Sequence, residues 1–337
     1  MTVEKRSIKD GNIFMLLLLV WFMFFGDIMG LVFMGLAALG LPISAVPAPG
    51  VVVLMQVGFF LLPLGIWLAL RKDKLRDVLP SMPLGGTNFA YIVAISILLQ
   101  PLLMGIVLLT NFIFPNNVAE FIGGMMHYPW WLMIVAIAVM PAICEEFVFR
   151  GYIQTKHRHL PFWKMLTANG LFFAIIHMNP HQFFYAFVMG VIFAVMVHFT
   201  RSIWAGVLSH FVLNASQVSL MYFFASLEGQ ITPAETEAVA SQAETIVAYG
   251  FLVFVLLACT GAAFTLTKAF IQHNKERIPK EELPEDTPKV RFFDGYVMAV
   301  ILLFLLFTLL LPMATRGSSR QEEHHDTIAI TSIKMPA

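Results

Sequence analysis

Long apolar runs recur along the whole chain, and each approaches or exceeds the roughly 20 residues that a helix needs to cross about 30 Å of hydrocarbon. None of them shows the strict alternation of a membrane β-barrel, so we predict helices. The composition agrees, because 58% hydrophobic and only 12% charged residues describe a chain whose solvent is lipid. The sequence therefore predicts an all-α, polytopic transmembrane helix bundle of eight or nine spans.

Nine apolar segments are candidate spans. They cover residues 13–38, 51–70, 88–114, 130–154, 162–178, 183–199, 203–225, 246–271 and 295–313. The fifth and sixth are short, which indicates helices that are packed inside the bundle or broken within it. We divide the chain into N-terminal transmembrane helices (1–128), a catalytic transmembrane core of spans four to seven (129–225), and an external loop with C-terminal helices and tail (226–337).

Among the loops between the spans, Lys and Arg occur only in alternate ones. The basic set consists of the N-terminus and residues 71–76, 156–164, 200–201 and 268–291, whereas residues 39–50, 115–129, 179–182 and 226–245 contain neither Lys nor Arg. Because cytoplasmic loops are enriched in these residues, we predict an integral membrane protein with a cytoplasmic N-terminus. Arg316 and Arg320 in the tail are an exception. A formal charge of zero gives no reason to expect nucleic acid as a partner.

Three spans carry polar side chains at membrane depth, where a charge costs about 2.5–3.5 kcal/mol. The fourth contains Cys144–Arg150 (CEEFVFR), the fifth ends at Phe173–His177 (FAIIH), and the seventh contains His210–Asn214 (HFVLN). Groups that are so costly in lipid need a reason to be there. These three segments are therefore the candidate functional site.

Helical geometry gives the two adjacent glutamates different surroundings, because neighbours in sequence lie about 100° apart and residues four apart share a face. Glu146 and Arg150 are such a pair, and an ion pair between them would neutralise one acid. Glu145 then points elsewhere without a local partner. A buried, unpaired carboxylate suits a general base or a general acid.

The same spacing places His210 and Asn214 on one face, and His177 lies on another helix above Phe173. We expect both imidazoles and the amide to converge on Glu145. One histidine would hold a water against the carboxylate, while the other histidine and the amide would donate hydrogen bonds to an oxyanion. This arrangement is sufficient for amide hydrolysis without a metal.

Structural interpretations compete with this one. Buried Glu–Arg pairs hold helices together, and histidines and asparagines make interhelical hydrogen bonds, but their concentration on three spans favours a function. The segment His177–His181 lacks the glutamate of a zinc HExxH motif, and Pro180 breaks the helix that would align two ligands. Ser209 and His210 do not form a dyad, since consecutive helical residues face apart.

These residues, in this order, resemble the CPBP family, which comprises CAAX proteases and bacteriocin-processing enzymes, including bacterial members once called Abi proteins. The family's motifs EExxxR, FxxxH, a glycine-containing helix and HxxxN correspond here to EEFVFR from Glu145, FAIIH from Phe173, FVMG ending at Gly190 with TRSIW from Thr200, and HFVLN from His210. The resemblance covers about residues 130–220.

The resemblance implies an intramembrane glutamate protease. In this family's scheme Glu145 activates water with help from His177, and His210 and Asn214 stabilise the oxyanion. Glu146 and Arg150, with the motif residue Phe173, have supporting roles. We expect no cofactor. Zinc is the alternative, because two histidines and a glutamate can ligate it, but Glu145 cannot easily be both ligand and base.

The predicted function is thus an endopeptidase that cleaves a hydrophobic or membrane-tethered peptide, with its site open toward the cytoplasm. The TRSIW segment and neutral pI favour a bacterial plasma membrane and leader peptides or bacteriocin precursors as substrates; a eukaryotic host would favour prenylated CAAX sequences. The alternatives are a non-catalytic immunity or scaffold protein and a proton-coupled transporter that uses Glu145. One tension remains: His177 falls near the opposite end of its span from Glu145, so that span must tilt or enter deeply.

Overall fold

The computed structural model describes residues 3–40, 46–228, 242–278 and 292–310. Within these ranges seven helices are long and apolar enough to cross a membrane, and two further apolar helices are shorter. The one extended pairing among the described residues is an isolated antiparallel bridge between Ser81 and Ser202. The predicted all-α, polytopic bundle is confirmed, and the chain is an integral membrane protein.

All nine predicted segments are helical where the structure describes them, except for residues 112–114 and 177–178, which follow the ends of their helices. The helices are α1 (Val3–Ala38), α2 (Ala48–Gln56), α3 (Leu62–Arg71), α4 (Leu75–Val78), α5 (Gly86–Asn111), α6 (Asn117–Gly124), α7 (Trp130–Ile134), α8 (Met140–Glu146), α9 (Gln154–His157), α10 (Phe162–Ile176), α11 (Pro180–Thr200), α12 (Ile203–Glu228), α14 (Gln242–Asn274) and α15 (Gly295–Leu305). π-helical turns join α2 to α3 (η2, Val57–Leu61), α7 to α8 (η3, Val135–Val139) and α8 to α9 (η4, Phe147–Ile153). The predicted external loop and tail lie largely outside the described residues.

The structure corrects the length of the sixth span. Helix α11 has 21 residues and is long enough to cross a membrane, because it begins at Pro180 rather than near residue 183. Asn179 explains this early start, since its side-chain oxygen accepts hydrogen bonds from the backbone N–H groups of His181 and Gln182. Helix α10 is short as predicted, with 15 residues.

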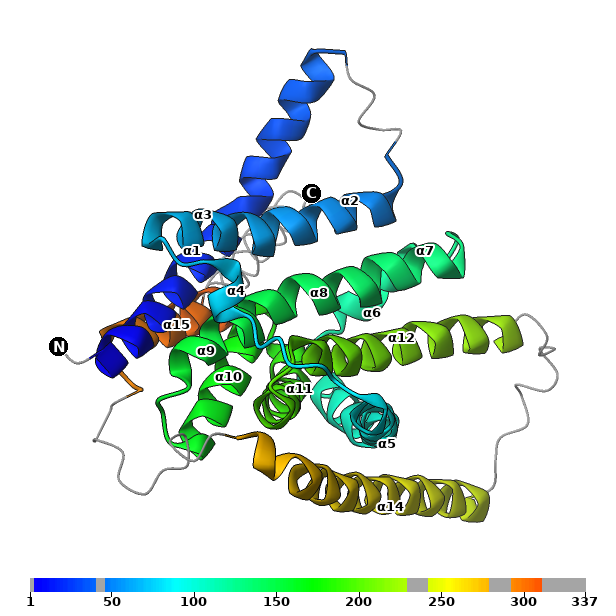
Figure 1. The fold of residues 1–337 in the computed structure, drawn as a ribbon. Helices are drawn as coiled ribbons and strands as arrows, with labels where there is room; N and C mark the ends of the chain where they lie inside the picture. Colours follow the sequence, from blue (N-terminus) through cyan, green and yellow to red (C-terminus); the bar gives the residue numbers. More distant parts are fainter. Residues whose placement is uncertain (1–2, 41–45, 229–241, 279–291, 311–337) are drawn as a thin grey trace, which may run out of the picture.

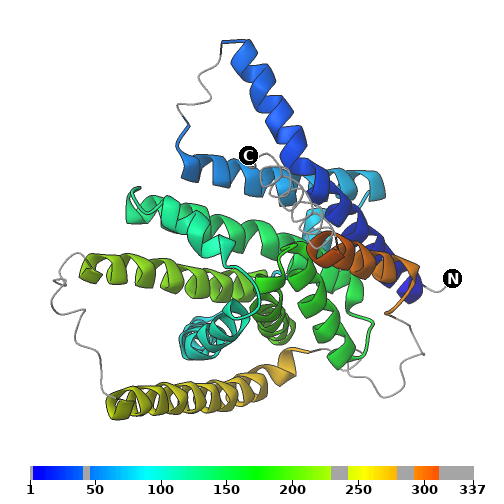
Figure 2. The same cartoon turned by 180° about the vertical axis from the view of Figure 1, so that it is seen from behind.

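The helices of the predicted core pack tightly on one another. Helix α10 packs on α11, and α12 packs on α5, α8 and α11, while α14 covers the outer side of α5. The first half of α1 contacts α9 and α15, whereas its second half projects away from the bundle (Figures 1 and 2). The continuous helix from α7 to α9 therefore lies at the centre, and more than half of its apolar window is buried.

The loops that carry Lys and Arg meet on one side of the bundle. Asp10 pairs with Arg71, and Lys156 forms a 2.7 Å ion pair with Asp73. The backbone N–H of Met82 donates to the carbonyl of Arg201. On the opposite side, the backbone N–H of Ala48 contacts the Tyr128 hydroxyl, which joins two of the loops without Lys or Arg. The alternation of charge in the sequence thus corresponds to two faces of the molecule.

Candidate active site

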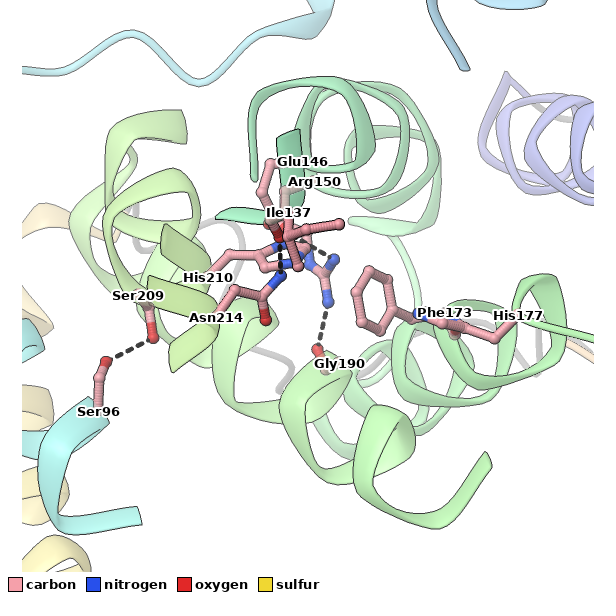
Figure 3. A network of polar contacts seen from close by, with 10 residues as sticks. All are labelled: Ser96, Ile137, Glu146, Arg150, Phe173, His177, Gly190, Ser209, His210 and Asn214. Carbon is pink, nitrogen blue, oxygen red and sulfur yellow. Dashed lines mark hydrogen bonds and ion pairs between the residues drawn. The ribbon is translucent and has the colours of Figure 1, made fainter. Parts of the chain in front are cut away.

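The two glutamates end helix α8, and π-helical turns lie on either side of it. A π turn interrupts the usual backbone ladder and is frequent at functional sites. In η3 the carbonyl of Ile137 accepts a hydrogen bond from the Asn214 side-chain amide at 3.1 Å (Figure 3). The irregular turn thereby fixes the position of α12 against the helix that carries the glutamates.

Glu146 and Arg150 form the predicted pair. Their ion pair measures 2.9 Å, and both side chains are completely buried. The Arg150 guanidinium also donates to the carbonyl of Gly190 at 2.8 Å, and it lies over the rings of Phe173 and Phe193 at 4.5 and 5.1 Å from their centroids. Figure 3 shows this cluster at the centre of the core helices.

His210 joins the same cluster from α12. Its Nδ1 lies 3.1 Å from the Glu146 carboxylate, and its ring stacks on Phe193 with centroids 5.0 Å apart. Its sequence neighbour Ser209 faces away and contacts Ser96 on α5 at 2.8 Å, so the predicted absence of a Ser–His dyad here is confirmed. Arg150 and His210 therefore both contact the Glu146 carboxylate.

The FxxxH spacing orients His177. Its Nδ1 lies 2.6 Å from the backbone carbonyl of Phe173. A carbonyl can only accept, so Nδ1 carries the hydrogen, and Nε2 is the nitrogen that can accept a hydrogen bond when the ring is neutral. The Phe173 ring meets His177 edge to face and also lies beside the Arg150 guanidinium (Figure 3). Phe173 therefore contacts both His177 and the buried Arg150.

A strained turn holds His177 at the end of α10. Met178 has a left-handed backbone with φ of 47°, which is costly for a residue with a side chain. Asn179 then caps α11, and Pro180 occupies its first turn. The predicted helix break at Pro180 is thus confirmed. Because 15 residues span only about 22 Å, α10 is shorter than the membrane is thick, so His177 at its end need not lie at the opposite membrane surface from Glu145.

Glu145 has different surroundings from its neighbour. It is only 6% exposed, and it makes no ion pair with any described residue. Its Oε2 atom is buried without a hydrogen-bond partner. Glu145 and His177 both line one cavity of about 900 Å³, whose other walls are mainly aromatic and aliphatic. The predicted separation of a paired and an unpaired glutamate is confirmed.

The direction of the cavity differs from our expectation. Its walls include Val46, Ala48 and Tyr128, which belong to the loops without Lys or Arg, so it extends away from the basic side. The reason is that α1 and α2 diverge toward this side (Figure 1), whereas the basic loops tie the helices together at the other end. A smaller polar recess of about 130 Å³ on the basic side reaches Arg150.

The hydrogen bonds of the His210 and Asn214 side chains go to groups other than Glu145, in contrast to the predicted convergence on that residue. His210 contacts Glu146, and Asn214 donates to the Ile137 carbonyl. His210 nevertheless lies close enough to Glu145 to act on it electrostatically. The oxyanion role of these two residues stays a prediction. The sequence reasoning also missed Gln56 and Gln182, which line the cavity from other helices and belong to no recognised motif.

Gly206 lets α12 approach the charged cluster. A Cβ atom at this position would lie 2.5 Å from Glu146 Oε2 and 3.0 Å from Val197 Cγ2. Because Arg150 and His210 both bind the Glu146 carboxylate, that carboxylate cannot easily move away from the added methyl group. We expect Gly206→Ala to destabilise the protein by about 1–3 kcal/mol, as overpacking does, measured as a fall in Tm in detergent. Gly261→Ala is the control, because no atom lies within 4 Å of its added Cβ; equal Tm changes in both variants would contradict the tight packing.

A comparison with known protein families matches the part of the chain that carries this site. Residues 127–216 match the family model described as Type II CAAX prenyl endopeptidase Rce1-like. No curated protein and no solved structure matches the chain. The matched segment contains both glutamates, His177, His210 and Asn214. The resemblance to the CAAX proteases is therefore confirmed over this segment, which indicates a membrane protease of CAAX type.

Proposed function

We propose that the protein is an intramembrane endopeptidase in which Glu145 activates a water for attack on a peptide bond. The observation that carries this proposal is the shared cavity: Glu145, which has no ion-pair partner among the described residues, and His177, whose Nδ1 is held by the Phe173 carbonyl, line the same largely apolar space. A carboxylate and an imidazole lone pair are both acceptors, and a water donates to both. The water is then held and polarised at the same time.

The reaction proceeds as general-base hydrolysis. Glu145 takes a proton from the water as its oxygen attacks the scissile carbonyl carbon. The tetrahedral intermediate then collapses, the C–N bond breaks, and the proton passes from Glu145 to the leaving amine. We propose that His210 and the second amide hydrogen of Asn214 stabilise the oxyanion. His210 uses Nδ1 toward Glu146, so it donates to the oxyanion only when Nε2 also carries a hydrogen.

The charges of the cluster suit this role. Glu146 and Arg150 form a completely buried ion pair, and His210 acts electrostatically on the neighbouring Glu145. The paired Glu146 and Arg150 therefore add no net charge to the buried cluster around Glu145. Buried charges are tolerated when they are paired in this way. The site is thus prepared to hold a base and a donor side by side at membrane depth.

The cavity favours a hydrophobic or lipid-tethered peptide as substrate. Its walls contain Phe22, Phe25, Phe59 and Phe60, and its volume of about 900 Å³ lies within the usual range of ligand pockets. Its polar lining residues include Glu145, His177, Gln56 and Gln182. An extended peptide placed there would have its carbonyl at the acid and its apolar part among the aromatic rings. We propose a bacterial plasma membrane as the location, with the basic loops and the N-terminus in the cytoplasm.

We propose metal-free catalysis. Among the residues that the structure describes, no three His, Cys, Asp or Glu side chains are grouped as metal ligands. His210 is engaged by Glu146, and His181, near the His177 turn, contacts Asn111 at 2.5 Å instead. We expect 1,10-phenanthroline to leave peptide cleavage by the purified protein unchanged within about twofold. A complete loss that added zinc reverses would support the zinc alternative.

The proposed function is tested with purified protein in lipid nanodiscs. The probes are an internally quenched farnesylated peptide that ends in a CAAX sequence and a quenched hydrophobic leader peptide without a lipid. In water enriched in ¹⁸O, hydrolysis places one ¹⁸O atom in the new carboxyl group of the product, which mass spectrometry detects. Absence of cleavage with both probes, in protein that is folded by circular dichroism, would contradict an endopeptidase of this specificity.

A further inference from the structure

Gln56 is a polar residue at the cavity that no motif and no comparison assigns, since it lies in the second span, outside residues 127–216. Its side-chain oxygen Oε1 is buried and has no hydrogen-bond partner. Gln56 lines the same cavity as Glu145, and its helix α2 contacts α8, which carries Glu145. An unpartnered buried acceptor costs about 1–3 kcal/mol, so its presence beside the proposed base calls for a ligand that supplies a donor.

The local fold holds Gln56 in this position. It ends α2 directly before the π turn η2, where Trp21 Nε1 donates to the carbonyl of Gly58 at 3.2 Å. The Phe25 ring packs so closely on Gly58 that a Cβ there would lie 2.7 Å from it. Helix α2 and turn η2 both contact α8, which carries Glu145. Two aromatic residues of α1 thus fix the backbone next to Gln56.

A count of donors and acceptors defines what Gln56 can bind. Three acceptor atoms belong to residues that line this cavity: Glu145 Oε2 and Gln56 Oε1, which are buried without a hydrogen-bond partner, and His177 Nε2. A water has two hydrogens, and in the proposed mechanism Glu145 and His177 receive them. Gln56 Oε1 is then left without a donor. The donor that every peptide substrate carries next to its carbonyl groups is a backbone N–H.

We propose that Gln56 anchors the substrate: its Oε1 accepts a hydrogen bond from a backbone N–H of the bound peptide, while its Nε2 faces Glu145. The inference rests on the proposed endopeptidase function and extends it by naming a substrate contact outside the family motifs. The carboxamide links base and substrate, so it sets the distance between Glu145 and the scissile bond. It recognises the peptide backbone and not a particular side chain.

The test combines Gln56→Met, which keeps the volume and removes the polar atoms, with a series of farnesylated CAAX peptides that are N-methylated at one backbone nitrogen at a time. We expect Gln56→Met to lower kcat/KM for the unmodified peptide by about tenfold, the worth of one hydrogen bond. For one of the N-methylated peptides, kcat/KM should be about tenfold lower than for the unmodified peptide with the natural protein. With Gln56→Met the same methylation should lower kcat/KM by less than about threefold. Gln100→Met, the same change at a glutamine outside the cavity, should keep the natural pattern.

A second measurement does not need turnover. The infrared C=O band of protonated Glu145 is assigned by its absence in Glu145→Gln, and we expect Gln56→Met to shift it to higher wavenumber because a hydrogen bond is lost. Full activity with an unchanged methylation pattern and an unshifted band would overturn the proposal. A shifted band in a protein that cleaves neither probe would reject the proposed function and keep the Gln56–Glu145 contact; an unshifted band in that case would reject both.

Discussion

Glu145→Gln should abolish peptide cleavage while the protein stays folded. The substitution keeps the shape of the side chain but removes its ability to take a proton, so the water is held without being activated. A positioned general base contributes about 10²–10⁴-fold to a rate, and we expect kcat to fall by at least this much. KM should change little, because Glu145 contacts the water and not the apolar part of the substrate. Steady-state cleavage of the quenched farnesylated peptide measures both constants.

Two comparisons make this result specific. Glu276→Gln, the same change at an exposed glutamate on the basic side, should retain full activity. Glu146→Gln should be less harmful to kcat than Glu145→Gln and more harmful to stability, since Glu146 binds Arg150 and His210. Equal effects at both glutamates would contradict their separate roles. A biological phenotype that survives Glu145→Gln would instead support the scaffold interpretation.

The local pairings of the site could be predicted from the sequence because they follow from helical spacing. The Glu146–Arg150 pair lies four residues apart on one helix, and the turn at Pro180 follows from the missing N–H of proline. Both depend on residues that are close in sequence. The all-helical class likewise followed from the length and polarity of each segment, and among the described residues seven of the nine predicted segments form helices long enough to cross a membrane.

Contacts between distant segments could not be predicted in this way. Which face of α12 meets α8 depends on Gly206, whose missing side chain leaves room for Glu146. The π turns shift the register of the helix that carries both glutamates, and apolar periodicity does not reveal them. Gln56 reaches the site from a span that shares no motif with it, and the direction of the cavity depends on the divergence of α1 from α2.

Arg150→Met should cause the largest loss of stability among single changes in the core. Arg150 and Glu146 are both completely buried, and removal of the arginine leaves Glu146 with His210 as its only remaining hydrogen-bond partner among the described residues. Breaking a buried ion pair by removing one partner costs about 3–5 kcal/mol. The hydrogen bond to Gly190 and the contacts with Phe173 and Phe193 are lost as well. Unfolding by SDS titration in mixed micelles measures the change, with the exposed Arg158→Met as control.

The double variant Glu146→Gln/Arg150→Met separates the cost of an orphaned charge from the value of the pair. If the loss in Arg150→Met comes mainly from an uncompensated Glu146 carboxylate, neutralising that carboxylate should recover about half or more of it, because a neutral amide is far cheaper to bury than a charge. Cleavage should not recover in parallel, since His210 loses the carboxylate that orients its ring. If the stability loss of the double variant equals the sum of the losses in the two single variants, Glu146 and Arg150 act independently. The charge balance proposed for the site would then be wrong.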